Sequence, residues 1–429
     1  MNMTESRNQM QRPLRDLLRV AAAGARGTDC GDLNVDWQSL VPLAAEQGIT
    51  GLVACAVLKS PRLACPDPLK QYLLSAMRTE ASVLLIRQQR ILHLLAEMKQ
   101  EGIETKLLKG YAVGRHYAHP ECRGSVDTDL LIDIRAEKKA IRFLEERGFR
   151  VSSRAATSQH AVCQHKKYGM VELHVAPYAE LIREIWFQGL NAETLIQEAC
   201  VTVETPDGSY TSLGYTDHLI FLTLHMAKHF ILSGLTVRMM LDIALFFSCN
   251  KERIDSKRFW DTLNRLGYAQ LVNCILWAVI LYGGFRTDDF PGCAGEAPEQ
   301  IPLIFDDLLE GGYMGARKEK ERYAGGMEYN RQLLMKNRTA AGYRLYMWGW
   351  KIKGGMKSMF PSRKTLAEMY PLVKKSVLLT PVMRVYHMFA FPIRKLCSDL
   401  LKQEIRSNES AISPESRKRL EMFRELKML

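Results

Sequence analysis

The sequence contains no apolar run long enough to cross a bilayer, for which about 20 residues are needed. Its most apolar segment, residues 271–285, is shorter, includes Asn273 and has a Gly-Gly pair near its end, so it predicts a buried helix. The first residues lack the long apolar core of a secretory signal. We therefore expect a cytoplasmic protein without a transmembrane segment.

No two of the ten cysteines form a C-x-x-C pair, and their scatter shows no zinc-binding spacing. Internal repeats and low-complexity tracts are missing as well. In a cytoplasmic chain this pattern predicts reduced thiols, several of them buried. Cys122 lies close in sequence to two aspartates. We expect it to line a pocket beside them, and no feature marks it as a nucleophile.

A surplus of acidic residues is also missing, since the net charge is +12. Residues 311–429 hold 25 Lys/Arg and 10 Asp/Glu, whereas residues 1–310 hold 34 and 37. Two interpretations of the basic end stay open. It is either a helical region whose long basic side chains extend to solvent, or a docking surface for a polyanion such as RNA, an acidic protein or an anionic membrane. On the second interpretation, removing residues 395–429 lowers transfer to that acceptor and spares NTP binding.

The hydrophobic pattern divides the chain. Up to residue 102, apolar residues recur at steps of three and four, which predicts helices. Short apolar stretches separated by turns then predict strands, and the helical pattern returns with Thr216 or Asp217 as the expected N-cap. We expect an α+β protein with an N-terminal helical region (1–102), a core sheet (103–214), a helical domain packed on that sheet (215–290), and a basic, mostly helical C-terminal region (291–429).

Two aspartates stand at the start of a strand-like stretch, "SVDTDLLIDI". Side chains alternate between the faces of a strand, so Ser125, Asp127 and Asp129 share one face. Charged groups entering a buried strand need a partner. Two carboxylates at this spacing suit a hard cation such as Mg²⁺, which also binds phosphate oxygens; a solvated strand end is the alternative. Asp133 lies on the same face beyond the apolar part and is expected to be an end cap or a solvated residue.

Two further segments add to this candidate site. "GMVELHVAP" places Glu172 inside a second apolar strand, with His174 on the same face. Lys109 and Gly110 follow a strand and precede a short helix, "YAVGRHYA". In that geometry backbone N–H groups face a phosphate, and the lysine adds a positive charge beside it.

These motifs resemble those of known enzymes. "LLKGYAVGRHY" followed by "RGSVDTDLLI" is similar to the signature of the DNA polymerase beta-like nucleotidyltransferases. More narrowly it resembles the bacterial "uncharacterised nucleotidyltransferase" family, and more distantly the abortive-infection toxin nucleotidyltransferases. "VELHV", "LTLHMAKHF" and "RMMLDIALF" extend the likeness, which covers about residues 35–285. It implies a small mixed nucleotidyltransferase sheet with flanking helices, between N-terminal and C-terminal helical regions.

The resemblance also implies roles for particular residues. The catalytic residues and ligands of Mg²⁺ (or Mn²⁺) would be Asp127, Asp129 and Glu172. The groups around the nucleotide triphosphate would be Lys109, Gly110, Arg123 and Ser125. The chain departs from the wider superfamily in having Tyr111 after Gly110, where serine or glycine is usual, and Thr128 between the aspartates, where an aliphatic residue is usual.

The activity implied is magnesium-dependent transfer of a nucleoside monophosphate from an NTP, with ATP as the default, and release of pyrophosphate. The acceptor is unidentified and is a small molecule, a protein or an RNA. A toxin role would be a biological variant of this activity. Two alternatives stay open: a catalytically silent relative that binds nucleotide as a scaffold or sensor, and a non-enzymatic helical interaction protein.

Four residues of the helical domain are possible accessory groups, as is His174. His225 and His229 are four apart and share a helix face. The glutamate of a zinc-protease motif is missing between them. They are either metal ligands, contacts to the nucleotide or acceptor, or, as we favour, a hydrogen-bonded pair that holds the helical domain against the sheet. Arg238 and Asp242 are also four apart and predict a structural ion pair.

Overall fold

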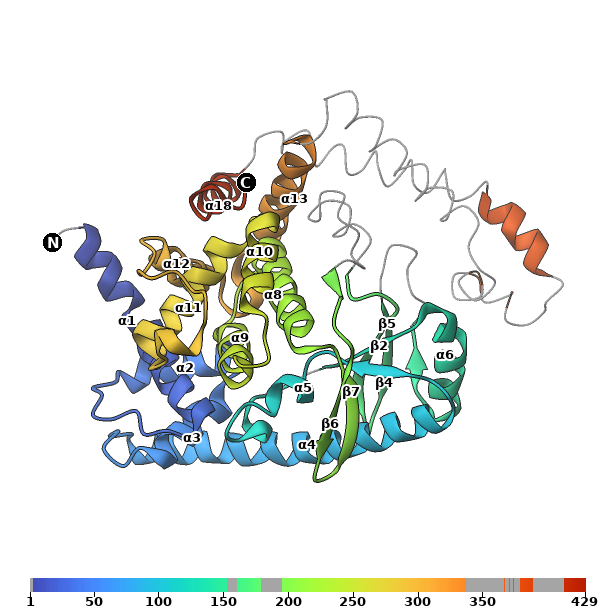
Figure 1. Ribbon diagram of the computed structural model, residues 1–429, viewed down its shortest axis with the longest axis horizontal. Helices are drawn as coiled ribbons and strands as arrows, with labels where there is room; N and C mark the ends of the chain where they lie inside the picture. The colour runs from blue at the N-terminus through green and yellow to red at the C-terminus, as the bar shows by residue number, and fades with distance from the viewer. Residues whose placement is uncertain are drawn as a thin grey trace.

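The fold is known from a computed structural model, which describes residues 3–125, 127–152, 160–178, 195–336, 379–388 and 413–429, together with positions 366, 370 and 373. It is an α+β protein, as predicted. The helical N-terminal region contains α1 (Met3–Arg26), α2 (Trp37–Glu46), α3 (Thr50–Lys59) and α4 (Asp67–Gln100). Figure 1 shows α4 as a long strut along one edge of the molecule. It packs against α3 at one end and against the sheet region at the other.

A five-stranded mixed sheet carries the candidate site. Its strand order is β1-β2-β5-β4-β3, in which only β2 and β5 are parallel. The strands are β1 (Thr105–Leu107), β2 (Asp127–Ile132), β3 (Arg150–Val151), β4 (His160–His165) and β5 (Gly169–His174). The short α5 (Tyr111–Gly114) follows β1, and α6 (Glu137–Glu146) follows β2. The predicted small mixed sheet is therefore confirmed.

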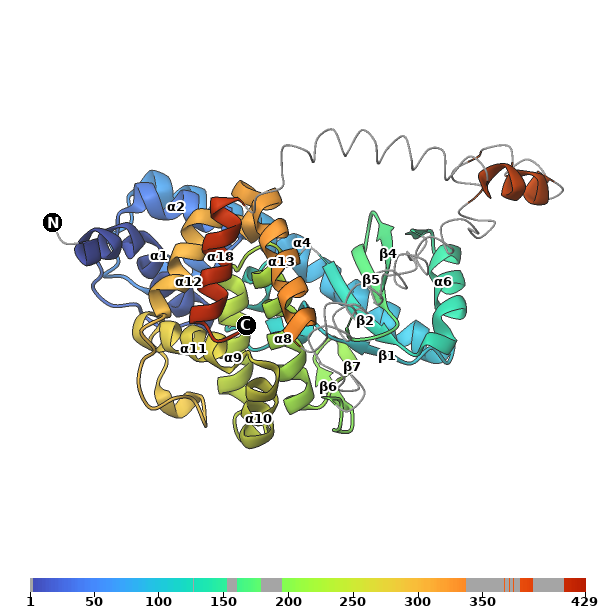
Figure 2. The ribbon, with the colours of Figure 1, turned by 90° about the horizontal axis from the view of Figure 1, so that it is seen from above.

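A separate hairpin of β6 (Val201–Thr205) and β7 (Gly208–Ser212) turns at Pro206-Asp207. Residues 379–388 are helical, and seven labelled helices also follow the hairpin in the described part of the chain (Figures 1 and 2). They are α8 (Tyr215–Leu232), α9 (Val237–Asn250), α10 (Ser256–Leu266), α11 (Ala269–Gly283), α12 (Ile301–Gly311), α13 (Glu319–Lys336) and α18 (Pro414–Glu425). None of the described helices combines the length and the apolar character that a membrane span requires.

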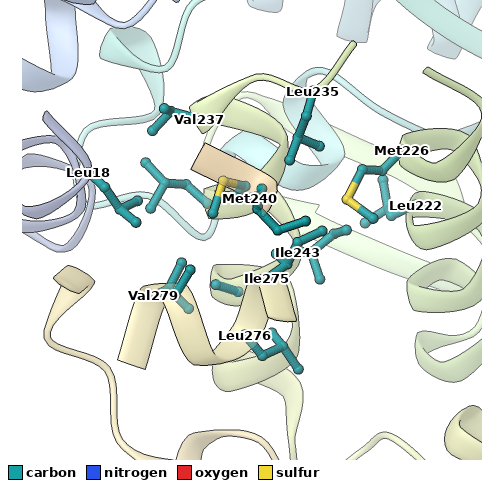
Figure 3. Close-up of a cluster of buried hydrophobic side chains, with 14 of the residues drawn as sticks. Leu18, Leu222, Met226, Leu235, Val237, Met240, Ile243, Ile275, Leu276 and Val279 are labelled. Atoms are coloured by element: carbon teal, nitrogen blue, oxygen red, sulfur yellow. The ribbon is translucent and has the colours of Figure 1, made fainter. Parts of the chain in front are cut away.

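One hydrophobic core joins helices from both ends of the chain. Figure 3 shows its centre, where side chains of α1, α8, α9 and α11 meet. The labelled residues include Leu18, Leu222, Met226, Met240, Ile243, Ile275, Leu276 and Val279. A second core lies between the sheet, α6 and the last turns of α4. The N-terminal helices therefore pack with the helices after residue 215, while the four-part division of the chain stays a prediction.

Local details differ from expectation in two places. Helix α8 begins at Tyr215 with Gly214 as its cap, because the Asp217 carboxylate instead accepts the backbone N–H groups of Gln197 and Glu198. Removing residues 395–429 would take away helix α18, which belongs to the core, because its Phe423 is fully buried. Most of the basic stretch between residues 337 and 412 lies outside the described residues. The cysteines within the described residues are all free thiols, as predicted.

Candidate active site

Three carboxylates from two neighbouring strands meet at one point of the sheet. Asp127 and Asp129 lie on β2, and Asp129 is paired in register with Glu172 on the parallel strand β5. One carboxylate oxygen from each residue lies within 4.8 Å of the other two. The alternation of strand side chains directs both aspartates to one face. The structure thus brings together the three carboxylates that the sequence singles out.

The donor set of this cluster fits a divalent cation. Asp129 is fully buried, and its Oδ2 accepts no hydrogen bond from any described residue. A buried charged oxygen without a partner is costly unless a donor or a cation reaches it. Carboxylate oxygens are the ligands that Mg²⁺ and Mn²⁺ prefer. Asp127, Asp129 and Glu172 therefore match a hard divalent ion.

Two nitrogen groups hold the other oxygen of Asp129. The Nζ atom of Lys109 lies 2.9 Å from Oδ1 of Asp129. Nε2 of His174 is also 2.9 Å from Oδ1, and it lies 3.4 Å from Oε2 of Glu172. Lys109 lies in the turn after β1, whereas His174 is the last residue of β5. Two separate parts of the sheet therefore fix the carboxylate of Asp129. The turn that carries Lys109 does not face solvent, since the lysine side chain is only 15% exposed.

The pKa values of the cluster diverge because each carboxylate has different neighbours. Burial raises the pKa of Asp127, and the negative charge of Asp129 raises it further. Burial alone would raise the pKa of Asp129, but Lys109 and His174 outweigh it and hold this pKa far below its usual value. For Glu172 burial is likewise opposed, and the hydrogen bond to His174 leaves the pKa lowered. Of the three carboxylates, Asp127 is thus the one whose charged form is disfavoured, and a nearby cation would favour that form.

A chain of polar side chains links the cluster to helix α8. Lys109 Nζ lies 3.1 Å from Nε2 of His225, and that nitrogen lies 3.0 Å from Nε2 of His229. Burial lowers the pKa of His225 well below its usual value and that of His229 to about 3, so both imidazoles are neutral near pH 7. The structure shows the hydrogen-bonded histidine pair that we favoured. Neither histidine belongs to a group of three possible metal ligands among the described residues.

The turn at Gly110 brings its backbone close to the start of β2. Gly110 has a φ of 64°, a value that favours glycine. A Cβ atom there would lie 3.4 Å from the Asp127 carbonyl oxygen and 3.5 Å from Oγ of Ser125. The Ser125 hydroxyl donates to that same carbonyl over 2.9 Å. Both residues line the cavity described below, and together they fix the backbone that carries Asp127.

Arg123 and Asp242 form a buried ion pair beneath this turn. Nε and Nη2 of Arg123 donate to the two oxygens of Asp242, each over 2.7 Å, and the Tyr117 hydroxyl donates to the same carboxylate. Burial alone would lower the pKa of Arg123, but Asp242 raises it. The predicted Arg238–Asp242 pair is wrong, because both oxygens of Asp242 bind Arg123. Arg238 instead donates to the carbonyl oxygen of Gly124 over 3.3 Å.

A cavity of about 360 Å³ opens beside the carboxylates, a volume within the range of small-ligand sites. Lys109 and Asp127 border it on the sheet side, and Arg238 borders it on the side of α9. A cavity of about 390 Å³ between α4 and the β6–β7 hairpin borders none of the three carboxylates. Cys122 lines a third cavity, between α3 and α4, so the expectation that it lines the aspartates' pocket is wrong.

Sequence reasoning missed two residues near the cluster. Lys228, on α8, makes no hydrogen bond or salt bridge to any other described residue, and burial lowers its pKa in spite of the attraction of Glu172 and Asp129. His160, on β4, has its Nε2 3.8 Å from Oε2 of Glu172. In the sequence, Lys228 is an isolated lysine between two histidines and His160 is a polar residue at a strand end. Only the packing of α8 and β4 around β5 identifies them.

The chain was also compared with known proteins. A family model described as "Uncharacterised nucleotidyltransferase" matches residues 34–282, which is more than half of the 429-residue chain. No curated protein gives a significant match. The matched span includes the whole sheet, α8, α9 and the three carboxylates.

Proposed function

The chain belongs to the uncharacterised nucleotidyltransferase family, and we propose that it is a polymerase beta-like enzyme that transfers a nucleoside monophosphate from an NTP to an acceptor, with release of pyrophosphate. The observation that carries this proposal is the convergence of Asp127, Asp129 and Glu172 beside Lys109, at the edge of a cavity. Family membership by itself supports a transferase; the site supports a metal-dependent one.

The three carboxylates would hold Mg²⁺ or Mn²⁺, which when bound neutralises the triphosphate and the pyrophosphate that leaves. Glu172 serves this purpose as a ligand, because its lowered pKa makes it a weak base. Asp129 is kept ionised by Lys109 and His174. Burial and Asp129 disfavour the charged form of Asp127, and a bound cation would offset this effect.

Two basic side chains that line the cavity, and a third near the carboxylates, are suited to the phosphates. Lys109 and Arg238 line it, and Lys228 faces the same carboxylates from α8. Lys228 is the strongest candidate for a phosphate contact, because within the described residues it makes no hydrogen bond or salt bridge. Arg123 is an indirect contributor: Asp242 binds its Nε and Nη2, and its Nη1 donates to the Gly124 carbonyl oxygen, so it helps to hold the Gly124–Ser125 turn in place.

The test is a transfer assay with each of the four α-³²P-labelled NTPs, Mg²⁺ or Mn²⁺, and a lysate fractionated into small molecules, protein and RNA. Label should move to one fraction only with active enzyme and a divalent cation. The double variant Asp127→Asn, Asp129→Asn is the control. Transfer by this variant at the wild-type rate would refute the assignment of the site. Binding of NTP without transfer to any fraction would favour the silent scaffold or sensor instead.

A further inference from the structure

Two histidines lie beside Glu172, on the same face of the sheet as the three-carboxylate cluster. In the antiparallel pair of β4 and β5, His160 is opposite His174, and Glu172 lies two residues before His174 on the same face. Oε2 of Glu172 is 3.8 Å from Nε2 of His160 and 3.4 Å from Nε2 of His174. All three ligand atoms lie within 4.8 Å of one another. We propose that His160, Glu172 and His174 form a second metal site, for a transition-metal dication such as Zn²⁺.

The spacing suits one ion bound by all three residues. Nitrogen and oxygen ligands bind Zn²⁺ at about 2.0–2.2 Å, and in a tetrahedral site this puts them roughly 3.4 Å apart. Two of the observed separations, 3.4 Å and 3.8 Å, are already close to that value. Small side-chain rotations therefore complete the site without a change in the backbone of either strand.

The ligand types separate this site from the neighbouring one. Imidazole nitrogens suit zinc and related transition metals, whereas sites of carboxylate oxygens alone suit magnesium. His160 and Glu172 are 27% and 19% exposed, so a fourth position is open to water or to a substrate atom, as in catalytic zinc sites. His174 Nε2 currently contacts Oδ1 of Asp129. The incoming ion takes the place of the proton in that contact, and Lys109 still holds Asp129.

The site shares Glu172 with the three-carboxylate cluster but does not rest on the proposed function. A chain that transfers no nucleotide would still bind the ion. In an active enzyme, an ion bound here would fix the orientation of Glu172 and reduce the negative charge of the cluster. The rate of transfer would then depend on whether a transition metal occupies this site.

The experiment uses the full-length chain without an affinity tag, stripped with a chelator and titrated with Co²⁺ in excess Mg²⁺. Histidine-bound Co²⁺ has visible d–d absorption bands, and one equivalent should bind and be displaced by Zn²⁺. His160→Gln should weaken binding at least about tenfold. His165→Gln is the matched control, since His165 lies on the same strand but an odd number of residues away, on the opposite face. It should bind Co²⁺ like the wild type.

Two more variants make the outcome decisive. His160→Cys keeps a ligand and should restore binding, with a new thiolate-to-cobalt charge-transfer band, which separates ligand loss from misfolding. Asp127→Asn should abolish nucleotidyl transfer and leave the Co²⁺ spectrum intact, so failure of the proposed function and failure of this site are distinguished. Equal affinities of the wild type and His160→Gln, or an equal loss in His165→Gln, would overturn the proposal.

Discussion

The ammonium group of Lys109 lies 2.9 Å from Oδ1 of Asp129, a carboxylate that is fully buried. A buried charge that loses its partner is strongly destabilising, because its desolvation is no longer compensated. Lys109 thus stabilises the fold as well as the site. Replacing Lys109 should therefore affect both.

Lys109→Ala should lower both the stability and the affinity for NTP. We expect a loss of about 1–3 kcal/mol in the free energy of unfolding, measured by urea denaturation, since Asp129 keeps only His174 as a partner. Saturating Mg²⁺ should restore more stability to this variant than to the wild type, because the cation replaces the lost charge. Unchanged stability with unchanged NTP affinity would contradict the role of the ion pair.

Asp127→Asn should reduce transfer by ~10²-fold or more, as removal of a group that stabilises transition-state charge typically does. The fold should remain intact. In the metal-free chain the melting temperature should be equal to that of the wild type or higher, because the variant removes a carboxylate whose ionised form is disfavoured by burial and by Asp129. Calorimetry with and without Mg²⁺ checks both statements. A melting temperature well below the wild-type value would mark Asp127 as structural.

The sequence predicts most of the sheet and the carboxylate cluster because both follow from local rules. Alternation places Asp127 and Asp129 on one face whatever surrounds the strand. In a small sheet, a second strand with an acidic residue is expected to lie close to the first. The structure confirms this, since Glu172 is paired in register with Asp129. Asp133 follows β2 directly and caps the 3-10 helix at Ile134–Ala136, since its side chain accepts the backbone N–H of Arg135. These features depend on residues a few positions apart.

The partners of charged residues are not predictable in the same way. Arg238 and Asp242 satisfy the four-residue rule, yet Asp242 pairs with Arg123, which is 119 positions away. Tertiary packing buries Asp242 where only a bidentate guanidinium satisfies both of its oxygens. Cys122 fails for a related reason, because its thiol points into the space between α3 and α4. These side-chain contacts depend on how the helices pack on the sheet, which cannot be predicted from residues a few positions apart.

Lys228→Met should weaken NTP binding about tenfold, or 1.4 kcal/mol, and should not reduce stability. Lys228 makes no salt bridge or hydrogen bond to a described residue, and burial disfavours its charge. Removing it therefore takes away a desolvated cation that the fold does not use. Calorimetric titration with a nonhydrolysable NTP measures the first effect and thermal melting the second. Lys257→Met, at an exposed position on α10, is the control. A large loss of stability with normal NTP affinity would assign Lys228 a structural role.

Buried histidines should make the protein sensitive to mild acid. Burial lowers the pKa of His218 to about 4 and that of His229 to about 3, whereas each titrates near 6.5 when unfolded. The unfolded chain therefore binds more protons below pH 6.5, and stability falls as the pH decreases. Each such histidine contributes a slope of about 1.4 kcal/mol per pH unit once the pH is well below 6.5.

This slope is measurable by urea unfolding between pH 6.5 and pH 5, a window in which few carboxylates titrate. His218→Gln should reduce the slope by about one proton, because the His218 imidazole is the only titrating group removed. Nε2 of His218 donates to the carbonyl oxygen of Leu108, a bond that the glutamine amide is able to replace. A stability that does not change across this window would show that these histidines are already protonated or are exposed in the fold.

The role of the basic C-terminal region is better tested by charge substitutions than by truncation, because a truncation would disturb the fold. Figure 2 shows α18 lying along α13, and its Phe423 is fully buried. Arg419 forms a buried ion pair with Asp307, and Ser416 donates to the Glu321 carbonyl over 2.9 Å. Deleting residues 395–429 removes this helix, so it should lower NTP binding and acceptor binding together. Phe423→Ala alone should cost about 3–5 kcal/mol.

Polyanion docking by this region remains a prediction. Neutralising exposed charges tests it without removing residues of the hydrophobic core. Arg417 and Lys427 are exposed on and just after α18. Arg417→Gln, Lys427→Gln should leave the melting temperature and NTP affinity unchanged. If a polyanionic acceptor docks here, binding of the acceptor fraction should weaken and its salt dependence should become shallower, because fewer counterions are released. The control is Lys138→Gln, Arg142→Gln on α6, which removes the same charge from the other end of the molecule. Equal binding and equal salt slopes in the wild type and both variants would show that this face of α18 serves only as part of the helical scaffold.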